Sequence, residues 1–475
     1  MDESPGDAAL YKQVARRIET LIRGGTLRSG ERIPSVRRAS EQHGVSITTT
    51  LQAYLELENR GLIEARPKSG FYVRARRMAR EPDATRPASA VTAVSVGSLQ
   101  SRLFEAAGMP DIVPFGSAAP GAELLPARKL NRILASLART AGSRGVGYAP
   151  PSGTETLRRE IAKRAFDTGS HVSLDEIVTT SGGTEALMLA LRAVTKPGDV
   201  VAVEAPTYFG LLHAIEMLGL NAVELPMHPR EGMDLDALEQ ALKRHPVAAC
   251  VTVPTFSNPL GTLMPDTHKE RLVELLGHRE IPLIEDDIFG ELYFEGARPR
   301  TAQSFDQRGL VLLCSSFSKT LAPGYRVGWI VPGRFRTAIQ ALKLAGTLTT
   351  ATLPELAIAE FLANGGYDYY LRSARRTYAQ QVERMRAAIT AAFPPHIRIT
   401  RPRGGFVLWI ELPKQVDALL LDDLALEQKI SIAPGPMFSA TQRFGNCIRI
   451  SCGHPWSDRI ESAIGTLGRL VRKLS

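Results

Sequence analysis

Residues 310–320 read Leu-Val-Leu-Leu-Cys-Ser-Ser-Phe-Ser-Lys-Thr, an apolar run that passes directly into hydroxyl groups and one lysine. The run at 310–313 is short and continuous, which is typical of a strand buried on both faces. Similar runs stand at 177–180, 200–203, 248–253 and 282–284, separated by helical patterns or turn-rich connections. This alternation predicts an α/β domain over residues 111–475, with a mostly parallel sheet and helices on both faces.

Polar side chains follow each of these predicted strands. The clusters are 181–184 (Ser-Gly-Gly-Thr), 204–208 (Glu-Ala-Pro-Thr-Tyr), 258–261 (Asn-Pro-Leu-Gly), 285–287 (Glu-Asp-Asp) and 315–320, with Arg326 seven residues after Lys319. Ligands of open α/β sheets bind beyond the carboxyl ends of the strands, so these clusters are the strongest functional signal in the chain.

Each cluster has a chemical interpretation, although none is specific alone. Glycines at a helix start allow a close approach of an anion to free N–H groups, but such starts are also common caps. Tyr208 fits a ligand site and an ordinary core position about equally well. Three acids at 285–287 need a cationic partner if they are buried. Hydroxyl groups, an amine and a guanidinium close together around Lys319 suggest a phosphate beside a reactive amine.

In this order, the five clusters resemble those of fold-type-I pyridoxal 5'-phosphate (PLP) enzymes of the aspartate aminotransferase superfamily. The resemblance implies PLP as cofactor and a smaller C-terminal α+β subdomain. It also implies that Lys319 forms a Schiff base with PLP and that Asp286 pairs with the pyridine nitrogen. Asn258 would then hydrogen-bond the ring hydroxyl, and Tyr208 would stack on the ring.

The same resemblance assigns the phosphate, subunit and substrate contacts. The phosphate ligands would be the N–H groups of Gly183 and Thr184 and the side chains of Ser316, Ser318 and Arg326. Tyr148 would reach the phosphate of the neighbouring subunit, which implies a homodimer, and Arg449 would clamp a substrate carboxylate. Aminotransferases usually carry Tyr three residues after the pyridine-binding Asp, where this chain has Phe289. That departure weakens the prediction of efficient transamination but not of PLP binding.

Residues 8–75 have the pattern of a small helical domain. Apolar residues recur at helical spacing over 10–22, a second helix can start at Pro34, and Ser46 can cap a third. Short strands follow at 62–65 and 71–73. This order predicts a winged helix-turn-helix, whose recognition helix enters the major groove of DNA. Residues 1–80 carry 15 Lys and Arg against 9 Asp and Glu, in a chain of net charge +9.

The segment is similar to the GntR family of bacterial transcription regulators, through Ile33-Pro34-Ser35-Val36-Arg37, Gly44-Val45-Ser46 and Ser69-Gly70-Phe71-Tyr72-Val73. The implied contacts with double-stranded DNA are Arg37, Arg38, Ser46, Thr48, Thr49 and Thr50, with Arg66 and Lys68 on the wing. Each arginine is about equally well explained as an exposed surface charge. The family often has Arg after the Ser that starts the recognition helix, and this chain has Ile47, so its base reading is left open.

Residues 76–110 are basic at first and then rich in Pro, Ala, Ser and Thr, which predicts a mobile linker. A GntR-like domain, a linker and an aminotransferase-like domain form the layout of the MocR/GabR group of regulators. The resemblance implies a PLP-dependent transcription regulator whose larger domain senses PLP, an amino acid or an amine. The alternatives are an active aminotransferase with an accessory DNA-binding domain and, less favoured, a PLP domain kept only as a dimerisation scaffold.

Composition limits the other classes. Hydrophobic residues make up 44% and charged residues 23% of the chain, which excludes a mainly disordered protein. No apolar run reaches the roughly 18 residues of a membrane helix. Four cysteines predict neither a disulfide framework nor a metal site. We therefore expect a cytoplasmic protein with no bound metal and no membrane contact. The effector, the operator and the direction of regulation stay open.

Overall fold

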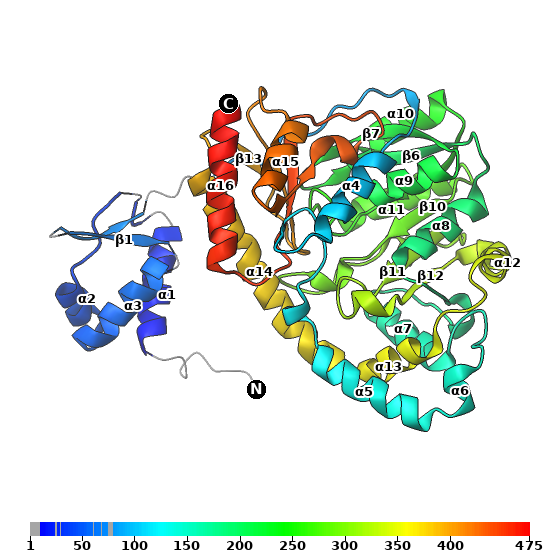
Figure 1. Cartoon of the computed structure of the whole chain (residues 1–475), viewed down its shortest axis with the longest axis horizontal. Helices are drawn as coiled ribbons and strands as arrows, with labels where there is room; N and C mark the ends of the chain where they lie inside the picture. Colours follow the sequence, from blue (N-terminus) through cyan, green and yellow to red (C-terminus); the bar gives the residue numbers. More distant parts are fainter. Residues whose placement is uncertain (1–9, 24–25, 29, 60, 68, 75–78) are drawn as a thin grey trace. The chain divides into compact units, whose positions relative to one another are not determined.

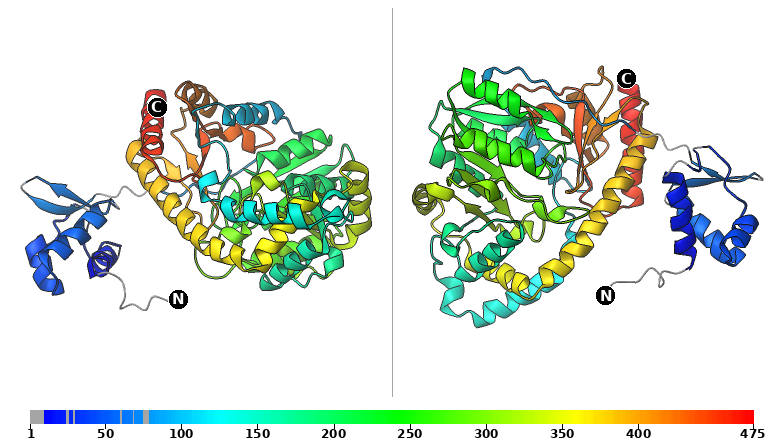
Figure 2. Two further views of the ribbon diagram at one scale, coloured as in Figure 1. Left: turned by 60° about the horizontal axis from the view of Figure 1, so that its bottom comes forward. Right: turned by 180° about the vertical axis from the view of Figure 1, so that it is seen from behind.

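The computed structural model describes residues 10–23, 26–28, 30–59, 61–67, 69–74 and 79–475. The chain divides into two compact units between residues 78 and 79 (Figures 1 and 2). Each unit has its own apolar core, so each is described separately below. No helix in the described ranges is long and apolar enough to cross a membrane.

The smaller unit is a winged helix-turn-helix, as predicted. Its elements are α1 (Leu10–Arg23), α2 (Val36–His43), α3 (Ile47–Asn59) and the antiparallel strands β1 (Ile63–Arg66) and β2 (Gly70–Val73). The three helices and the hairpin share one core that includes Ile18, Tyr54 and Leu57. Ser46 caps α3 as expected, because its Oγ accepts a hydrogen bond from the Thr49 N–H at 3.0 Å. The second helix starts later than predicted, at Val36, since Ser35 and not Pro34 provides its cap.

The larger unit is built on one main sheet. Its strand order is β3 (Val91–Ala93), β7 (Asn221–His228), β6 (Val200–Ala205), β9 (Val247–Thr252), β10 (Leu283–Asp286), β11 (Val311–Ser316), β12 (Gly328–Val331) and β5 (Val178–Thr180), with β8 (Gly232–Met233) paired to β7. Neighbours from β7 through β11 are parallel, whereas β3 and β12 run antiparallel to their neighbours. The predicted mostly parallel α/β sheet is therefore confirmed.

Helices cover both faces of this sheet because alternate strand residues point in opposite directions. In β6, Val201 and Val203 belong to the cluster with α8 (Gly183–Val194), α9 (Phe209–Met217) and α12 (Arg336–Gly346). Val200 and Ala202 belong to the cluster with α10 (Leu235–Arg244) and α11 (Asp266–Gly277). Figure 1 shows these layers in green and yellow.

A second, smaller part of this unit is α+β. Its sheet has the order β13 (Arg398–Ile399), β14 (Val407–Glu411), β17 (Cys447–Ser451) and β16 (Ala433–Pro434), and β15 (Ile430–Ser431) pairs with β4 (Val113–Pro114). Its helices are α14 (Gly366–Ala392), α15 (Ala418–Glu427) and α16 (Asp458–Leu474). The remaining helices are α5 (Ala127–Thr140), α6 (Ser143–Val146), α7 (Glu155–Asp167) and α13 (Thr352–Ala363). Figure 2 shows the long α14 crossing the unit.

From residue 79 onward, the predicted linker is part of the larger unit. β3 pairs with β7, and α4 (Gly97–Ala107) packs on α9. Thr85 is anchored as well, because its Oγ donates to the Ala205 carbonyl at 2.6 Å. A three-residue strand is too short to show a period, whereas Leu99 and Leu103 of α4 stand at helical spacing that the linker prediction overlooked.

The start of α4 depends on one carboxylate. Glu216 Oε2 accepts the N–H groups of Val96 and Gly97 at 2.9 and 3.0 Å. We predict that Glu216→Ala speeds hydrogen exchange at both amides roughly 2- to 30-fold, since loss of a cap costs about 0.5–2 kcal/mol. Mass spectrometry of exchange measures this effect, with the exposed Glu231 as the matched control in Glu231→Ala. Equal exchange in both variants would contradict the capping role.

Candidate functional site

A cavity of about 280 Å³ opens at the edge of the main sheet where the strands have their carboxyl ends. This volume lies near the lower end of the usual range for small-molecule sites, roughly 300–1,000 Å³. The lining residues are Phe104, Gly183, Thr184, Leu187, Tyr208, Val253, Asn258, Asp286, Ile288, Phe289, Ser318, Lys319 and Arg326. All five predicted polar clusters therefore contribute at least one residue to this cavity.

One end of the cavity is a cradle for an anion. Gly182 precedes α8 with φ 85°, and a Cβ there would lie 2.3 Å from Nη2 of Arg326, so this position requires glycine. The N–H groups at the start of α8, at Gly183 and Thr184, have no partner within the helix. The Arg326 guanidinium donates to Ser318 Oγ at 3.3 Å and to the Ser181 carbonyl at 3.1 Å. Free N–H groups, a hydroxyl and a cation together suit a phosphate.

Asp286 is the last residue of β10 and is almost fully buried. Burial, together with the charge of Asp287, raises its pKa to about 7, although Lys319 and the Ile288 N–H oppose the rise. A ligand that brings an N–H donor or a positive charge would stabilise the ionised form of this carboxylate. The Asp286 side chain is therefore suited to a protonated ring nitrogen.

Lys319 follows β11 and reaches the same cavity. Its Nζ donates to the Ala118 carbonyl at 2.6 Å. Burial and the charge of Arg449 lower the pKa of Lys319 to about 8, whereas Asp286 opposes this change. A substantial fraction of neutral amine is then present near pH 8, and the neutral form is the nucleophile.

Two side chains and one departure from the aminotransferase pattern shape the rest of the cavity. Asn258 accepts a hydrogen bond from Arg449 Nη1 at 3.4 Å through its amide oxygen, which leaves the amide nitrogen to donate to a ligand. Burial raises the pKa of Tyr208 to about 12, so this phenol stays protonated. Phe289 is buried edge-on against Phe406, with ring centroids 5.2 Å apart. It lines the cavity but offers no hydroxyl.

Arg449 on β17 is fully buried and lies one contact away from the cavity, through Asn258. Its other contacts are the Gly116 carbonyl and the face of Phe438, 5.5 Å from the ring centroid. Its Nε has no hydrogen-bond partner, and no described carboxylate forms an ion pair with it. Burial lowers its pKa to about 10. The carboxylate of a ligand would stabilise this buried and unpaired guanidinium.

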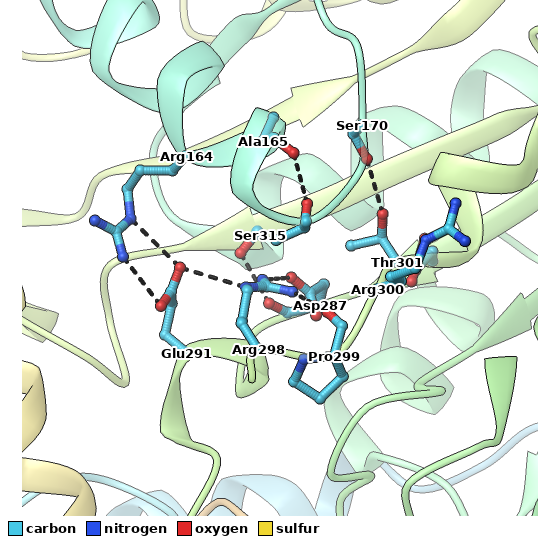
Figure 3. A network of polar contacts seen from close by, with 12 residues as sticks. Arg164, Ala165, Ser170, Asp287, Glu291, Arg298, Pro299, Arg300, Thr301 and Ser315 are labelled. Atoms are coloured by element: carbon cyan, nitrogen blue, oxygen red, sulfur yellow. Dashed lines mark hydrogen bonds and ion pairs between the residues drawn. The ribbon is translucent and has the colours of Figure 1, made fainter. Parts of the chain in front are cut away.

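The next residue in the chain, Asp287, belongs to a largely buried ionic network (Figure 3). Asp287 pairs with Arg298, whose Nε lies 3.4 Å from Glu291. Glu291 also binds Arg164 and Arg375, each at 3.1 Å. The expectation that buried acids need cations holds here for Asp287, whereas Glu285 is instead satisfied by the N–H groups of residues 302 and 303. The pairing removes Asp287 from the cavity and leaves Asp286 to face it.

The structure also places the remaining predicted site residues. Ser316 is buried, and its Oγ accepts the Ser318 N–H at 3.1 Å, so it supports the cradle without lining the cavity. Tyr148 is 85% exposed and lies outside the cavity of its own chain. Two unpredicted residues matter as well. Phe104 enters the cavity from α4, and Arg298 neutralises Asp287, which no local sequence pattern indicates.

The predicted DNA contacts divide into three groups. Arg37, Arg38, Ser46 and Thr48 are exposed, and Thr49 is half-buried with its hydroxyl 2.7 Å from that of Ser46. Arg66 is partly engaged, because it pairs with Glu64 at 2.9 Å and lies over the Tyr72 ring. Thr50 is withdrawn from the contacts, since its side chain is fully buried and donates to the Ser46 carbonyl. Lys68 lies outside the described residues.

Comparisons with known proteins agree with both units. Residues 115–467 match the family model "Aminotransferase class I and II", and residues 10–73 match "Bacterial regulatory proteins, gntR family". The chain is 39% identical over 463 residues to the uncharacterized HTH-type transcriptional regulator YjiR of Escherichia coli, covering 97% of this chain and 98% of the relative. A second E. coli regulator, YdcR, is also 39% identical, with 98% and 99% coverage.

Solved aminotransferases share the fold of the larger unit. The α-aminoadipate aminotransferase LysN of Thermus thermophilus, in complex with N-(5'-phosphopyridoxyl)-L-leucine, superposes with a TM-score of 0.74 at 30% identity, covering 79% of this chain and 95% of that one. The larger unit thus has the architecture of a fold-type-I PLP protein. The chain belongs to the aminotransferase class I and II family and carries a gntR-family domain at its N-terminus, which confirms the MocR/GabR resemblance.

The residues of the cavity fit PLP, the cofactor of this family. The glycine-dependent cradle suits the phosphate, and Asp286 suits the pyridine nitrogen. The amide of Asn258 suits the ring hydroxyl, and Lys319 suits the aldehyde. Two cations, Lys319 and Arg326, line the cavity with one carboxylate, Asp286, and the Arg449 guanidinium lies one contact away. The site therefore carries an excess of positive charge that an anionic cofactor would offset.

The Asp287–Arg298 pair allows a test of the network behind the site. We predict that Arg298→Met lowers the free energy of unfolding by about 3–5 kcal/mol, because Asp287 would stay buried without its cation. Denaturant unfolding followed by circular dichroism measures the loss. Arg308→Met is the control, since its pair with Glu280 is half exposed and screened by solvent. Similar losses in both variants would contradict the account.

The raised pKa of Asp286 predicts a pH-dependent effect. Its pKa is about 7 in the folded protein against 3.8 unperturbed, so the folded state without cofactor holds a proton that the unfolded state releases. Stability then falls as pH rises from about 4 to 7. Asp286→Asn avoids this loss, so its cofactor-free form should melt at a higher temperature than wild type at pH 8 and at a similar temperature near pH 4. Its PLP affinity should fall about 10- to 100-fold. A lower melting temperature at pH 8 would contradict this assignment.

Proposed function

We propose that this protein is a PLP-dependent transcription regulator that binds double-stranded DNA through its winged helix-turn-helix and holds PLP covalently through Lys319. The observation that carries the proposal is the presence of both sites in one chain. A winged helix-turn-helix with exposed arginines precedes a cavity that combines a phosphate cradle, Lys319 and Asp286. The relatives that match nearly the whole chain are HTH-type regulators, which supports the same function.

When bound, PLP supplies an aldehyde that condenses with amines and a ring that withdraws electrons from the adjoining carbon. Lys319 would hold the aldehyde carbon, and its pKa of about 8 keeps part of the amine in the neutral, nucleophilic form. Asp286 would hold the proton of the ring nitrogen, and the Asn258 amide would donate to the ring oxygen. The N–H groups of Gly183 and Thr184, with Ser318 and Arg326, orient the phosphate, and Ser316 holds Ser318 in place.

The effector is an amino compound that carries a carboxylate. Arg449 supports this choice because it is buried, lacks a carboxylate partner among the described residues and keeps an unpartnered Nε. Its hydrogen bond to Asn258 links the carboxylate position to the ring position. An amine without a carboxylate would leave the Arg449 charge uncompensated and should therefore bind more weakly.

The signal reaches the DNA-binding unit along the chain that connects the two units. Phe104 of α4 lines the cavity and is 60% exposed, so a ligand there changes its surroundings directly. The chain before α4 is held by Glu216 and by β3 and leads back to residue 79. A ligand that binds better when α4 takes one of two positions would increase the population of that position. The segment before α4 would shift with it.

The regulator acts as a homodimer in the cytoplasm. Val146 and Tyr148 are 90% and 85% exposed, which is unusual for large apolar side chains and supports their burial against a second copy. Tyr148 would then reach the phosphate of the partner. The cytoplasm is where DNA and free amino acids are both present.

A second candidate function is transamination. It is favoured by 33% identity over 370 residues to the 2-aminoadipate transaminase of Thermus thermophilus, which covers 77% of this chain. Phe289 argues against efficient turnover, because Asn258 is left as the donor to the ring oxygen. Single-turnover and steady-state assays with amino acids and a keto acid separate the two functions. Rapid repeated turnover would favour the enzyme.

Lys319 provides the direct test of the proposed function. We predict that Lys319→Ala shows no cofactor adduct by mass spectrometry after borohydride reduction and that its DNA affinity no longer responds to amino acids. Lys414→Ala, at an exposed position, should keep both properties. Gel shifts on the DNA upstream of the gene measure the response at several salt concentrations.

Two results would contradict the proposal. Binding that is blind to sequence would remove the regulatory role. An amino-acid response that persists in Lys319→Ala would show that sensing does not use this lysine.

A further inference from the structure

The outward face of α3 has an unusual composition. The exposed residues of this helix are Ile47, Thr48, Leu51, Gln52 and Leu55, whereas Thr50, Ala53, Tyr54 and Leu57 face the core. The exposed positions recur at helical spacing, so they form one continuous face. Ile47, Leu51 and Leu55 are 53%, 41% and 47% exposed, which places three large apolar side chains in solvent on one short helix.

This face carries no cation. Residues 47–59 contain neither Lys nor Arg, the side chains that pair with guanine in the major groove. The groups that α3 does present are alkyl chains, one hydroxyl and one amide. Alkyl side chains contact the C5-methyl group of thymine, and Gln pairs with N6 and N7 of adenine. Both partners belong to an A·T base pair.

We propose that α3 reads A·T base pairs in the major groove, with Gln52 on adenine and Ile47 and Leu51 on thymine methyl groups. The proposal rests on the DNA-binding function proposed above and adds the bases that are read. Ile47 and Thr48 form the first turn of α3, and Leu51 and Gln52 stand one turn later. The N-terminal residues of a recognition helix are the ones that reach base edges.

The charges around α3 fit duplex DNA as the occupant of this face. Arg37 and Arg38 are exposed in the first turn of α2 and can contact phosphates, which position a protein without reading sequence. The acidic residues of α3, Glu56 and Glu58, stand near its C-terminal end, away from Ile47. Glu58 is already engaged by the Ala65 N–H at 2.9 Å. Both acids of α3 itself therefore stand in its C-terminal half, and its N-terminal half carries no negative charge.

The proposal is tested with the full-length, PLP-loaded protein and a pool of randomised DNA duplexes. Selection and sequencing should yield a site with A·T pairs at the positions that α3 protects. In the selected duplex, each thymine is then replaced by uracil, which lacks only the methyl group. At the contacted position, we expect affinity to fall about fourfold, the factor that follows from burying one methyl group.

Variants assign each contact to a side chain. In Ile47→Ala or Leu51→Ala, the uracil effect should disappear at one position, because the methyl group has lost its partner. In Gln52→Ala, affinity should fall roughly 5- to 150-fold. The same variant should become insensitive to 7-deazaadenine, which lacks the N7 acceptor. Ile47→Arg should shift the selected base pair from A·T to G·C.

Matched controls separate base reading from general effects. Leu21 on α1 has the same 41% exposure as Leu51, and Gln42 is exposed on α2. Leu21→Ala and Gln42→Ala should keep the uracil and 7-deazaadenine effects of the wild-type protein. Analytical ultracentrifugation of Ile47→Ala and Leu51→Ala shows whether the apolar face instead joins two copies of the chain.

The outcomes distinguish this inference from the proposed function. If no sequence is enriched, the DNA-binding function fails and the inference with it. If a sequence is enriched but uracil substitution and the Gln52→Ala change leave its selection unaltered, the inference alone is overturned. A change of association state in Ile47→Ala without a change of base preference would also overturn it, in favour of a contact between copies.

Discussion

An excess of positive charge at one edge of the sheet is the constraint on which the larger unit depends. Lys319 and Arg326 line a cavity that holds one carboxylate, Asp286, and the buried Arg449 lies one contact away through Asn258. Protein interiors do not favour unpaired charge, and the lowered pKa values of Lys319 and Arg449 express that penalty. A ligand with a phosphate and a second ligand with a carboxylate would relieve it. The positive charge of the site thus favours ligands that carry these two anionic groups.

The fold creates this arrangement by ending parallel strands at one edge. β5, β10 and β11 each pass from a buried apolar run into a polar loop, so side chains far apart in sequence come together. Behind them, Arg298 neutralises Asp287, which keeps a single acid facing the ligand. The same chain begins with a winged helix-turn-helix whose recognition helix lacks cations. The cations around the cavity and the uncharged outward face of α3 thus belong to different units of the chain.

Much of this could be predicted from the sequence because the signals are local. Apolar runs predicted five strands of the main sheet, and the order of the polar clusters indicated the cofactor site. Several misses depend on tertiary structure, and others on a helical period that was overlooked. The strand at 91–93 forms because β7 offers an edge, and Phe104 reaches the cavity because α4 packs on α9. Thr50 was grouped with its neighbours Thr48 and Thr49, yet the helical period turns it into the core. Arg298 stands in a loop well after its partner Asp287 in the sequence, and no sequence motif marks it.

The charge balance of the cavity can be measured directly. Absorption titrations of the cofactor-free protein compare pyridoxal 5'-phosphate with pyridoxal, which carries the same ring and aldehyde without the phosphate. If the cradle of Gly183, Thr184, Ser318 and Arg326 neutralises a phosphate, the phosphorylated compound should bind at least about 100-fold more tightly, the factor expected for charge-assisted hydrogen bonds. Equal affinities, or no binding of either compound, would contradict the account.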